Sequence, residues 1–489
     1  MKLFQNILTV GIWTLMSRIL GLVRDILLLA FIGVGPVLDA FIVAFRLPNM
    51  FRRLFAEGAF NAAFVPIYTK RLQSGEKAES FVLEAVSGLT FVLLIGTGLG
   101  MIFMPGLVWV TASGFSGDQR FELAVEYGKI MFPYIFLISL TALLSGALNA
   151  HGRFSMAAAA PIFLNIIIIT ALSLAWFLRQ EPAFFVVWSI PIAGVVQLSL
   201  LWWNARQSGI MVKLIRPKLS PDMLHLITVA IPAALSNGIV QINLLVGTIV
   251  ASFFPGAVSW LYGADRLYQL PLGIVGISVG IVLLPELSKR LHAGDRAGAK
   301  VAFSRASEIS FALSFPASVA LFVIPLPLVS ALFEHGATDR NDVEAISLAC
   351  SIYGLGLPAF VLQKVLQPLY FSQENTKSPF RFALIAMIIN GVLAIGLMKP
   401  CGWIAPAIAV TVSAWLMVGL LAIGAREFSD VARISKVSQN RMIRIGFAAI
   451  GMGIALWSID SFIGTYTERT LIRVLYGFSL AFAGLAIYS

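Results

Sequence analysis

Three charged side chains lie inside the first long apolar segment of the chain, which runs from Ile7 to Phe31. They are Arg18, Arg24 and Asp25. A charge near the middle of a bilayer costs roughly 2.5–3.5 kcal/mol on insertion scales, so such charges usually face a water-filled cavity. Because a planar guanidinium can bind two phosphate oxygens at once, arginines in a cavity suit an anionic cargo. The cluster therefore predicts an anion-binding site with Arg18 and Arg24 as ligands.

Helical spacing separates the roles within this cluster. Arg18 and Asp25 are seven residues apart and share a face, whereas Arg24 points about 120° away from Arg18. Gly21 lies between them and would let a ligand or another backbone approach closely. We interpret Asp25 as the carboxylate that orients or restrains an arginine. The alternative is a buried ion-pair network that only joins helices.

A second charged cluster follows in the segment 46–57, RLPNMFRRLFAE. Arg53 and Glu57 are four residues apart and can pair on one helical face, near the rim of a cavity. Arg52 points elsewhere and shares its face with Asn49, so these two are the better ligand candidates. Arg46 lies nearer the middle of the span and is an alternative ligand.

Asp39 follows the turn sequence Gly33-Val34-Gly35-Pro36 and begins the next apolar segment. One interpretation is a helix N-cap, because a short acidic side chain can accept a backbone N–H at a helix start. The other is a gate, in which this carboxylate pairs with a cavity arginine when the outer end closes. The two roles are compatible.

Two further candidates lie in the second half of the chain. Arg266 sits deep in an apolar segment, and its neighbour Asp265 can neutralise it. One arginine from each half of the chain, facing one interface, would make a basic site on which both halves close. Lys364 lies within an otherwise apolar segment and is a further candidate for binding.

The elements that position these residues follow from composition. The chain has 489 residues, of which 58% are hydrophobic and only 12% charged, with a mean hydropathy of +0.89. A soluble protein of this length would need far more charge on its surface. We therefore predict an all-α polytopic membrane protein with about fourteen transmembrane helices. Their approximate limits are 5–33, 37–68, 81–111, 123–150, 155–178, 183–204, 223–253, 258–287, 303–333, 344–371, 380–398, 402–424, 442–460 and 471–488.

Hydropathy alone would also allow residues 46–57 to be a cytoplasmic loop. The matching segment 265–276, DRLYQLPLGIVG, is much more apolar and belongs to one continuous run. By analogy we favour a single helix over 37–68, bent near Pro48, with the arginines on its polar face.

The basic residues predict the orientation in the membrane. With both termini in the cytoplasm, the cytoplasmic loops and loop edges carry 21 Lys and Arg residues and the outer loops carry 6. This asymmetry follows the positive-inside rule. It also explains most of the net charge of +11 without nucleic acid as a partner. The six outer residues are Arg120, Arg179, Arg340, Lys399, Arg469 and Arg473.

The chain contains an internal repeat. Residues 64–78 read FVPIYTKRLQSGEKA and residues 283–297 read LLPELSKRLHAGDRA, an offset of 219. Asn165 and Asn390 match at an offset of 225, and we interpret both as interhelical hydrogen-bond partners. Six spans per repeat give the two lobes the same orientation, as in a parallel pseudo-two-fold repeat. We predict lobes at 1–204 and 205–424, followed by two extra helices in 425–489.

Several function classes are excluded by missing motifs. The sequence has no P-loop, no nucleophile elbow and no paired-histidine zinc motif, so we expect neither an enzyme nor an ATP-driven pump. Its four histidines are scattered and its two cysteines, Cys350 and Cys401, read as packed side chains. We expect no cofactor and no metal site, and the coupling ion cannot be read from the sequence.

Three segments carry a resemblance to a known family. They are SRILGLVRDILLLAFIGVGPVLDAFIVAFRLPNMFRRLFAEGAFNAAFVPIY (17–68), GALNAHGRFSMAAAAPIFLN (146–165) and SWLYGADRLYQLPLGIVGISVGIVLLPELSK (259–289). The chain resembles the MurJ/MviN family of lipid II flippases, within the multidrug/oligosaccharidyl-lipid/polysaccharide exporter superfamily. The resemblance extends over essentially the whole chain.

This resemblance implies a function and its machinery. It implies that the chain flips lipid II, an undecaprenyl-diphosphate-linked disaccharide-peptide, to the outer leaflet of the bacterial inner membrane by alternating access through a central cationic cavity. The family's important arginines map onto Arg18, Arg24, Arg52 and Arg266, and its acidic partners onto Asp25 and Asp39. The last two spans would form a groove for the polyprenyl tail. Membrane lipids and cell-wall synthesis proteins would be its other partners.

The chain departs from the family pattern at one place. Some members of the family resemble sodium-coupled transporters, with carboxylates in the seventh and eleventh helices, but here 223–253 and 380–398 have only Asp222 at an edge. Because a hard cation needs several oxygen ligands, we do not expect sodium coupling through that site. Two other functions are open: export of another polyprenyl-diphosphate-linked oligosaccharide, and a membrane scaffold for cell-wall enzymes that transports nothing.

Overall fold

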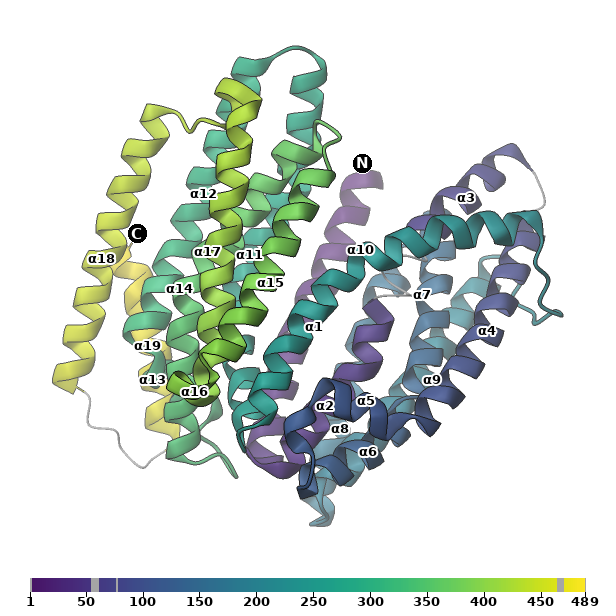
Figure 1. Cartoon of the computed structure of the whole chain (residues 1–489), viewed down its shortest axis with the longest axis horizontal. Helices are drawn as coiled ribbons and strands as arrows, with labels where there is room; N and C mark the ends of the chain where they lie inside the picture. Colours follow the sequence, from purple (N-terminus) through teal and green to yellow (C-terminus); the bar gives the residue numbers. More distant parts are fainter. Residues whose placement is uncertain (1, 54–60, 76–77, 464–469, 489) are drawn as a thin grey trace. The chain divides into compact units, whose positions relative to one another are not determined.

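The computed structural model describes residues 2–53, 61–75, 78–463 and 470–488. Within these ranges the chain forms helices and no strand, and it divides into two compact units, Met1–Pro255 and Gly256–Ser489 (Figure 1). The first unit contains α1 (Lys2–Ile32), α2 (Pro36–Phe51), α3 (Asn61–Ser74), α4 (Ala78–Ile102), α5 (Met104–Thr111), η2 (Ser113–Phe115), α6 (Gln119–Met131), α7 (Tyr134–Ala150), α8 (Ser155–Leu178), α9 (Pro182–Gln207) and α10 (Pro221–Ser252). The second contains α11 (Ala257–His292), α12 (Arg296–Val323), α13 (Pro325–Phe333), α14 (Arg340–Phe371), α15 (Lys377–Gly396), α16 (Met398–Cys401), η3 (Gly402–Ile404), α17 (Ala405–Gly424), η4 (Ala425–Ala432), α18 (Lys436–Ile463) and α19 (Thr470–Tyr488).

The predicted spans coincide with these helices, singly or as consecutive pairs, and the all-α prediction is confirmed. In the described part of the chain, 8 helices are long and apolar enough to cross a membrane by length and composition alone. The pair α6–α7, bent by 41°, would make a ninth. The bend falls at Pro133, which cannot donate a backbone hydrogen bond to continue the first helix.

The helix expected over 37–68 is described only in part. It begins at Pro36, contains Pro48 and continues through Arg53, and α3 resumes at Asn61. Residues 54–60, which include Glu57, lie outside the described residues. The choice between a continuous helix and a loop therefore remains a prediction.

The internal repeat has a counterpart in local structure. Gly75 and Gly294, which match in sequence, end α3 and α11 with left-handed φ angles of 72° and 74°. This conformation is available to glycine at little steric cost. In each unit the chain also returns to a serine on the helix that follows this turn. The Ile215 N–H donates to Ser87 Oγ at 2.9 Å, and the Ser435 N–H donates to Ser304 Oγ at 3.0 Å.

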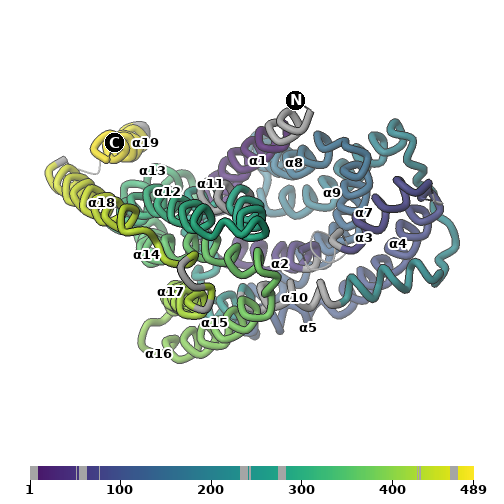
Figure 2. The backbone as a smooth tube through the Cα atoms, turned by 90° about the horizontal axis from the view of Figure 1, so that it is seen from above, coloured from purple at the N-terminus to yellow at the C-terminus, as the bar shows by residue number. Residues whose placement is uncertain are grey.

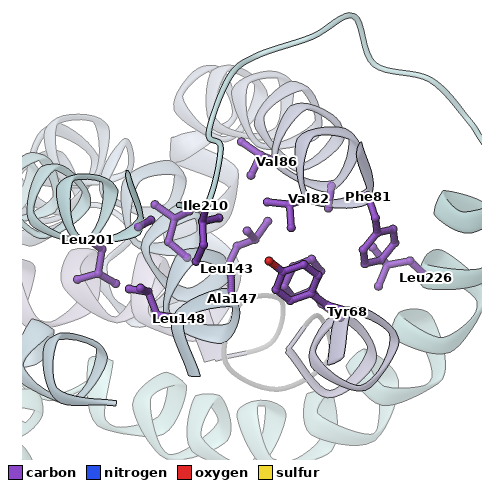
Figure 3. Close-up of a cluster of buried hydrophobic side chains, with 14 of the residues drawn as sticks. Tyr68, Phe81, Val82, Val86, Leu143, Ala147, Leu148, Leu201, Ile210 and Leu226 are labelled. Atoms are coloured by element: carbon purple, nitrogen blue, oxygen red, sulfur yellow. The ribbon is translucent and has the colours of Figure 1, made fainter. Parts of the chain in front are cut away.

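Apolar side chains join the helices of the first unit at one end. Tyr68 of α3, Phe81 and Val82 of α4, and Leu143 of α7 are all buried and belong to one cluster (Figure 3). Leu226 of α10 is part of the same cluster. These contacts form one contiguous apolar cluster that joins α3, α4, α7 and α10.

The seventh predicted span, α10, is also fastened to the first unit by polar contacts. Arg71 forms an ion pair with Asp222, and the Ser220 hydroxyl donates to a Glu84 carboxylate oxygen. At the other end of α10 the Gly114 N–H donates to Ser252 Oγ at 2.9 Å. The lobe boundary at 204/205 was predicted from the sequence repeat and stays a prediction; α10 itself packs with the helices that precede it.

The last two helices lie beside α12 and α13 at the edge of the second unit (Figure 2). Ile324, Met452, Leu456 and Leu480 form their buried apolar contact. An ion pair between Arg473 Nη1 and Glu334 Oε1, at 2.5 Å, fastens the start of α19 to the end of α13.

Candidate functional site

The first candidate cluster is built on α1 around Arg24. The Nε and Nη2 groups of Arg24 donate to Oδ1 of Asp25 at 2.9 and 2.7 Å. Asp25 therefore restrains an arginine, as the sequence suggested, and the structure identifies that arginine as Arg24. Two hydrogen bonds from one guanidinium to one carboxylate oxygen fix the direction of the arginine fork, and each is strengthened by charge.

Asn165 of α8 completes this cluster. Arg24 Nη1 donates to Asn165 Oδ1 at 2.9 Å, and Asn165 Nδ2 donates to the backbone carbonyl of Ser17 at 3.0 Å. The predicted interhelical hydrogen bond of Asn165 is confirmed, and its contact with Arg24 was not foreseen. A Cβ atom added to Gly21 would lie 3.7 Å from Asn165 Nδ2, which is an ordinary van der Waals contact, so the asparagine packs directly on this turn of α1.

Burial decides which charge this cluster presents. The Asp25 side chain is 2% exposed, whereas that of Arg24 is 12% exposed. The carboxylate is hidden behind the guanidinium, so the accessible part of the pair is cationic. Asp25 partly neutralises the charge of Arg24, but the direction of the guanidinium is fixed. A guanidinium with a fixed direction suits a specific anion better than a loosely bound counterion.

Arg18 and the candidates on α2 are half-buried. Arg18 lies on α1 in the turns before Arg24. Arg46 Nη1 donates to the Leu244 carbonyl of α10 at 3.5 Å. Asn49 Nδ2 donates to the Phe45 carbonyl one turn earlier at 3.1 Å, so this amide is engaged with its own helix.

The remaining candidates of the second cluster are described incompletely. Arg52 is half-buried and keeps helical angles at the end of α2, and Arg53 is exposed. The expected pairing of Arg53 with Glu57 falls on a residue outside the described part of the chain.

Asp39 is fully buried, and Arg120 pairs with it. Arg120 Nη1 lies 3.5 Å from Asp39 Oδ2, and the two side chains are 5% and 0% exposed. Arg120 also pairs with Asp118 Oδ2 at 2.6 Å and lies over the Phe115 ring at 4.4 Å. The sequence did not predict this ion pair with α6, and the pairing of Asp39 with a cavity arginine on closure stays a prediction.

The N-cap interpretation of Asp39 is wrong. The helix begins at Pro36 after Gly35, so Asp39 lies within its first turn. A carboxylate there still interacts favourably with the helix N-terminus. Arg120 itself was missed as a partner because its sequence position suggests only a loop charge.

The second basic cluster lies on α11. Arg266 Nη2 donates to Asp265 Oδ2 at 3.3 Å, and the guanidinium carbon lies 4.6 Å from the centre of the Tyr262 ring. Gln269 Nε2 donates to the same Asp265 oxygen. The Arg266 and Asp265 side chains are 29% and 28% exposed, so both charges of this pair are accessible.

Lys364 is exposed on α14 and is not brought to the Arg266 cluster by any described contact. Its neighbour Gln363 donates to the Ala414 carbonyl of α17 at 3.1 Å, which is a packing role. Among the described residues no group of three His, Cys, Asp or Glu side chains could hold a metal ion. The chemistry that the clusters support is anion recognition by arginine.

Comparisons with known proteins agree with these features. The family model described as "Lipid II flippase MurJ" matches residues 28–477. A curated relative from Rhizobium tropici, named "Probable lipid II flippase MurJ", is 44% identical over 85% of this chain and 79% of its own length. A relative of the same name from Rickettsia prowazekii is 33% identical over 100% of this chain and 97% of its own length.

Solved structures give the same grouping. A structure described as "Lipid II flippase MurJ, inward closed conformation" has a TM-score of 0.81 and 25% identity, and covers 98% of each chain. An inward-facing multidrug resistance MATE family transporter has a TM-score of 0.74 at 15% identity, over 85% of this chain and 95% of that one. The second likeness concerns the fold alone.

Proposed function

The chain belongs to the MurJ family of lipid II flippases, and from this premise we propose that the Arg24 cluster receives the diphosphate of its cargo. The protein is a multi-pass inner-membrane transporter that moves lipid II and is not an enzyme. One observation carries the proposal. The guanidinium of Arg24 is held by Asp25 and Asn165 while the carboxylate itself is hidden.

A held arginine is well suited to a diphosphate. Its fork can engage two oxygens at once, and its orientation is already fixed before the cargo arrives. Arg18 on the same helix, with Arg46, Arg52 and Asn49 of α2, supplies further donors from the first unit. In the second unit Arg266 presents a further cation to an anionic cargo, and its own ion pair is more exposed.

We propose that both termini are cytoplasmic and that the cargo enters from the cytoplasmic leaflet. The 21-to-6 distribution of basic loop residues supports this orientation. The membrane potential is a suitable energy source, because moving one charge through the field is worth about 2.3 kcal/mol per 100 mV. No cofactor is needed for such a cycle, and another ion is the alternative driver.

The tail of the cargo needs an apolar surface. We propose that α18 and α19, after the two predicted six-helix lobes, form a groove for the polyprenyl chain. Exposed apolar side chains on both helices, among them Phe447, Trp457 and Phe482, support this role. Cell-wall synthesis proteins are proposed as partners that deliver or consume the cargo.

Two other functions make different predictions. An exporter of another polyprenyl-diphosphate-linked oligosaccharide would use the same arginines but would not support lipid II exposure. A scaffold that recruits cell-wall enzymes would need no charge at the Arg24 position, so removing that charge would leave its function intact.

The experiment is complementation of a bacterium depleted of its own flippase. Lipid II at the outer leaflet is measured by its cleavage with an externally added enzyme. The wild-type chain should restore cleavage, and Arg24→Ala at equal abundance in the membrane should not. Restoration by both chains would contradict the site. Restoration by neither, with a Rhizobium tropici relative active in the same host, would contradict the cargo.

A further inference from the structure

Two residues other than glycine adopt positive φ angles among the described residues. They are Arg179, with φ 53°, and Glu374, with φ 58°. Every other positive φ in the described chain belongs to a glycine. A side chain in this left-handed region is strained, and such strain often persists where a side chain has a function.

Arg179 ends α8 in a motif that would normally favour glycine. The Gln180 N–H donates to the Ala175 carbonyl at 3.0 Å, and the Arg179 N–H donates to the Trp176 carbonyl at 3.2 Å. This is the Schellman pattern, with Arg179 at the left-handed position.

Arg179 lines a cleft of about 590 Å³ at the end of the first unit. The cleft lies where α1 and α8 end and α9 begins, and its other lining side chains include Phe31, Trp176, Phe177 and Gln180. Among the described residues that line it, Arg179 alone is charged. Trp176 and Phe177 are 68% and 76% exposed, so they face the surroundings rather than the helical core.

These features match a site for a lipid at the membrane interface. Exposed aromatic side chains lie at the level of the head groups, where their apolar bodies contact acyl chains. A guanidinium beside them can bind a phosphate bidentately. We propose that this cleft binds the phosphate of an anionic phospholipid on Arg179, with the acyl chain along Trp176 and Phe177. In the proposed orientation, with both termini cytoplasmic, the cleft lies at the outer leaflet.

The ligand proposed for this cleft is a membrane lipid, so its binding does not depend on the identity of the transported cargo. A phospholipid, the transported cargo and free phosphate all carry a phosphate that Arg179 could bind. The aromatic side chains favour a lipid over free phosphate because they offer contact area for an acyl chain.

The test measures lipid preference at Trp176 by fluorescence quenching with brominated lipid. The purified chain is placed in vesicles that contain brominated phosphatidylglycerol and unlabelled phosphatidylcholine at constant salt. The emission of Trp176 is isolated by subtracting the emission of a Trp176→Phe variant. We expect a preference of about fivefold for phosphatidylglycerol, the effect of one basic residue at an interface.

Arg179→Gly should abolish this preference while raising the melting temperature by about 1–2 °C, because glycine relieves the left-handed strain. Arg179→Lys should retain most of the preference. Glu374→Gly is the matched control, since it should stabilise the chain similarly and keep the full preference at Trp176. An unchanged preference in Arg179→Gly would overturn the proposal. Loss of the wild-type preference on adding millimolar inorganic phosphate would also overturn it, since the site would then take a free anion.

Discussion

The Arg24 cluster and the Arg266 cluster begin from the same short pattern, an arginine beside an aspartate in an apolar helix. In the first unit the carboxylate of Asp25 is hidden, and Asn165 reaches across from α8 to hold the guanidinium. In the second unit the carboxylate is shared with Gln269 on the same helix, and both charges are accessible. Both arginines have an ion pair with the adjacent aspartate, so the ion pair does not distinguish them. The difference shows that a contact from a neighbouring helix, here Asn165 of α8, determines how firmly the guanidinium is held.

Removing the two carboxylates should separate the clusters most strongly. Asp25→Asn leaves a largely buried guanidinium without its counter-charge and should lower the free energy of unfolding by about 3–5 kcal/mol. Asp265→Asn should change it by no more than about 1 kcal/mol, because exposed pairs contribute little. Denaturant titration in lipid–detergent micelles measures the free energy of unfolding of both variants. Equal losses would show that Asp25 and Asp265 stabilise the chain to the same extent.

Asn165→Ala should have the next largest effect. A hydrogen bond to a charged group contributes about 1.5–3 kcal/mol, so affinity for lipid II should fall roughly tenfold or more as Arg24 loses its direction. Asn165→Asp keeps an acceptor for Arg24 and should recover part of the affinity.

Asn390→Ala is the matched control for Asn165→Ala. Asn390 is the same residue type at the matching repeat position and is also buried. It should lower stability while leaving lipid II affinity within about twofold, since it lies on α15, whereas the two arginine clusters are built on α1 and α11. A comparable loss of affinity in both variants would mean that the effect of Asn165 is only structural.

Tyr262→Leu should produce the smallest change. The ring under Arg266 contributes roughly 1 kcal/mol of cation–π attraction, so lipid II affinity should fall about fivefold. Tyr262→Phe keeps the aromatic face and should bind like the wild type. If Tyr262→Leu and Tyr262→Phe bind lipid II with the same affinity, the aromatic ring does not position Arg266.

The sequence predicts the helices well because the physical signal is local. Hydropathy locates most of the spans, and the charge pattern predicts that Asp25 restrains an arginine, although it does not say which one. The repeat draws attention to Asn165, although only the packing of α8 on α1 brings it to Arg24. Neither hydropathy nor the repeat could identify Arg120. It pairs with Asp39 across two helices, α6 and α2, and such a contact leaves no periodic pattern in either segment.

Binding of lipid II to Arg24→Gln and to Arg266→Gln tests the comparison most directly. Both variants remove one cation and keep a polar side chain of similar length, and affinity is measured on purified protein in micelles. We expect Arg24→Gln to weaken binding at least tenfold more than Arg266→Gln, because Asp25 and Asn165 hold the less exposed guanidinium of Arg24 before the cargo arrives. An equal or larger loss in Arg266→Gln would contradict it.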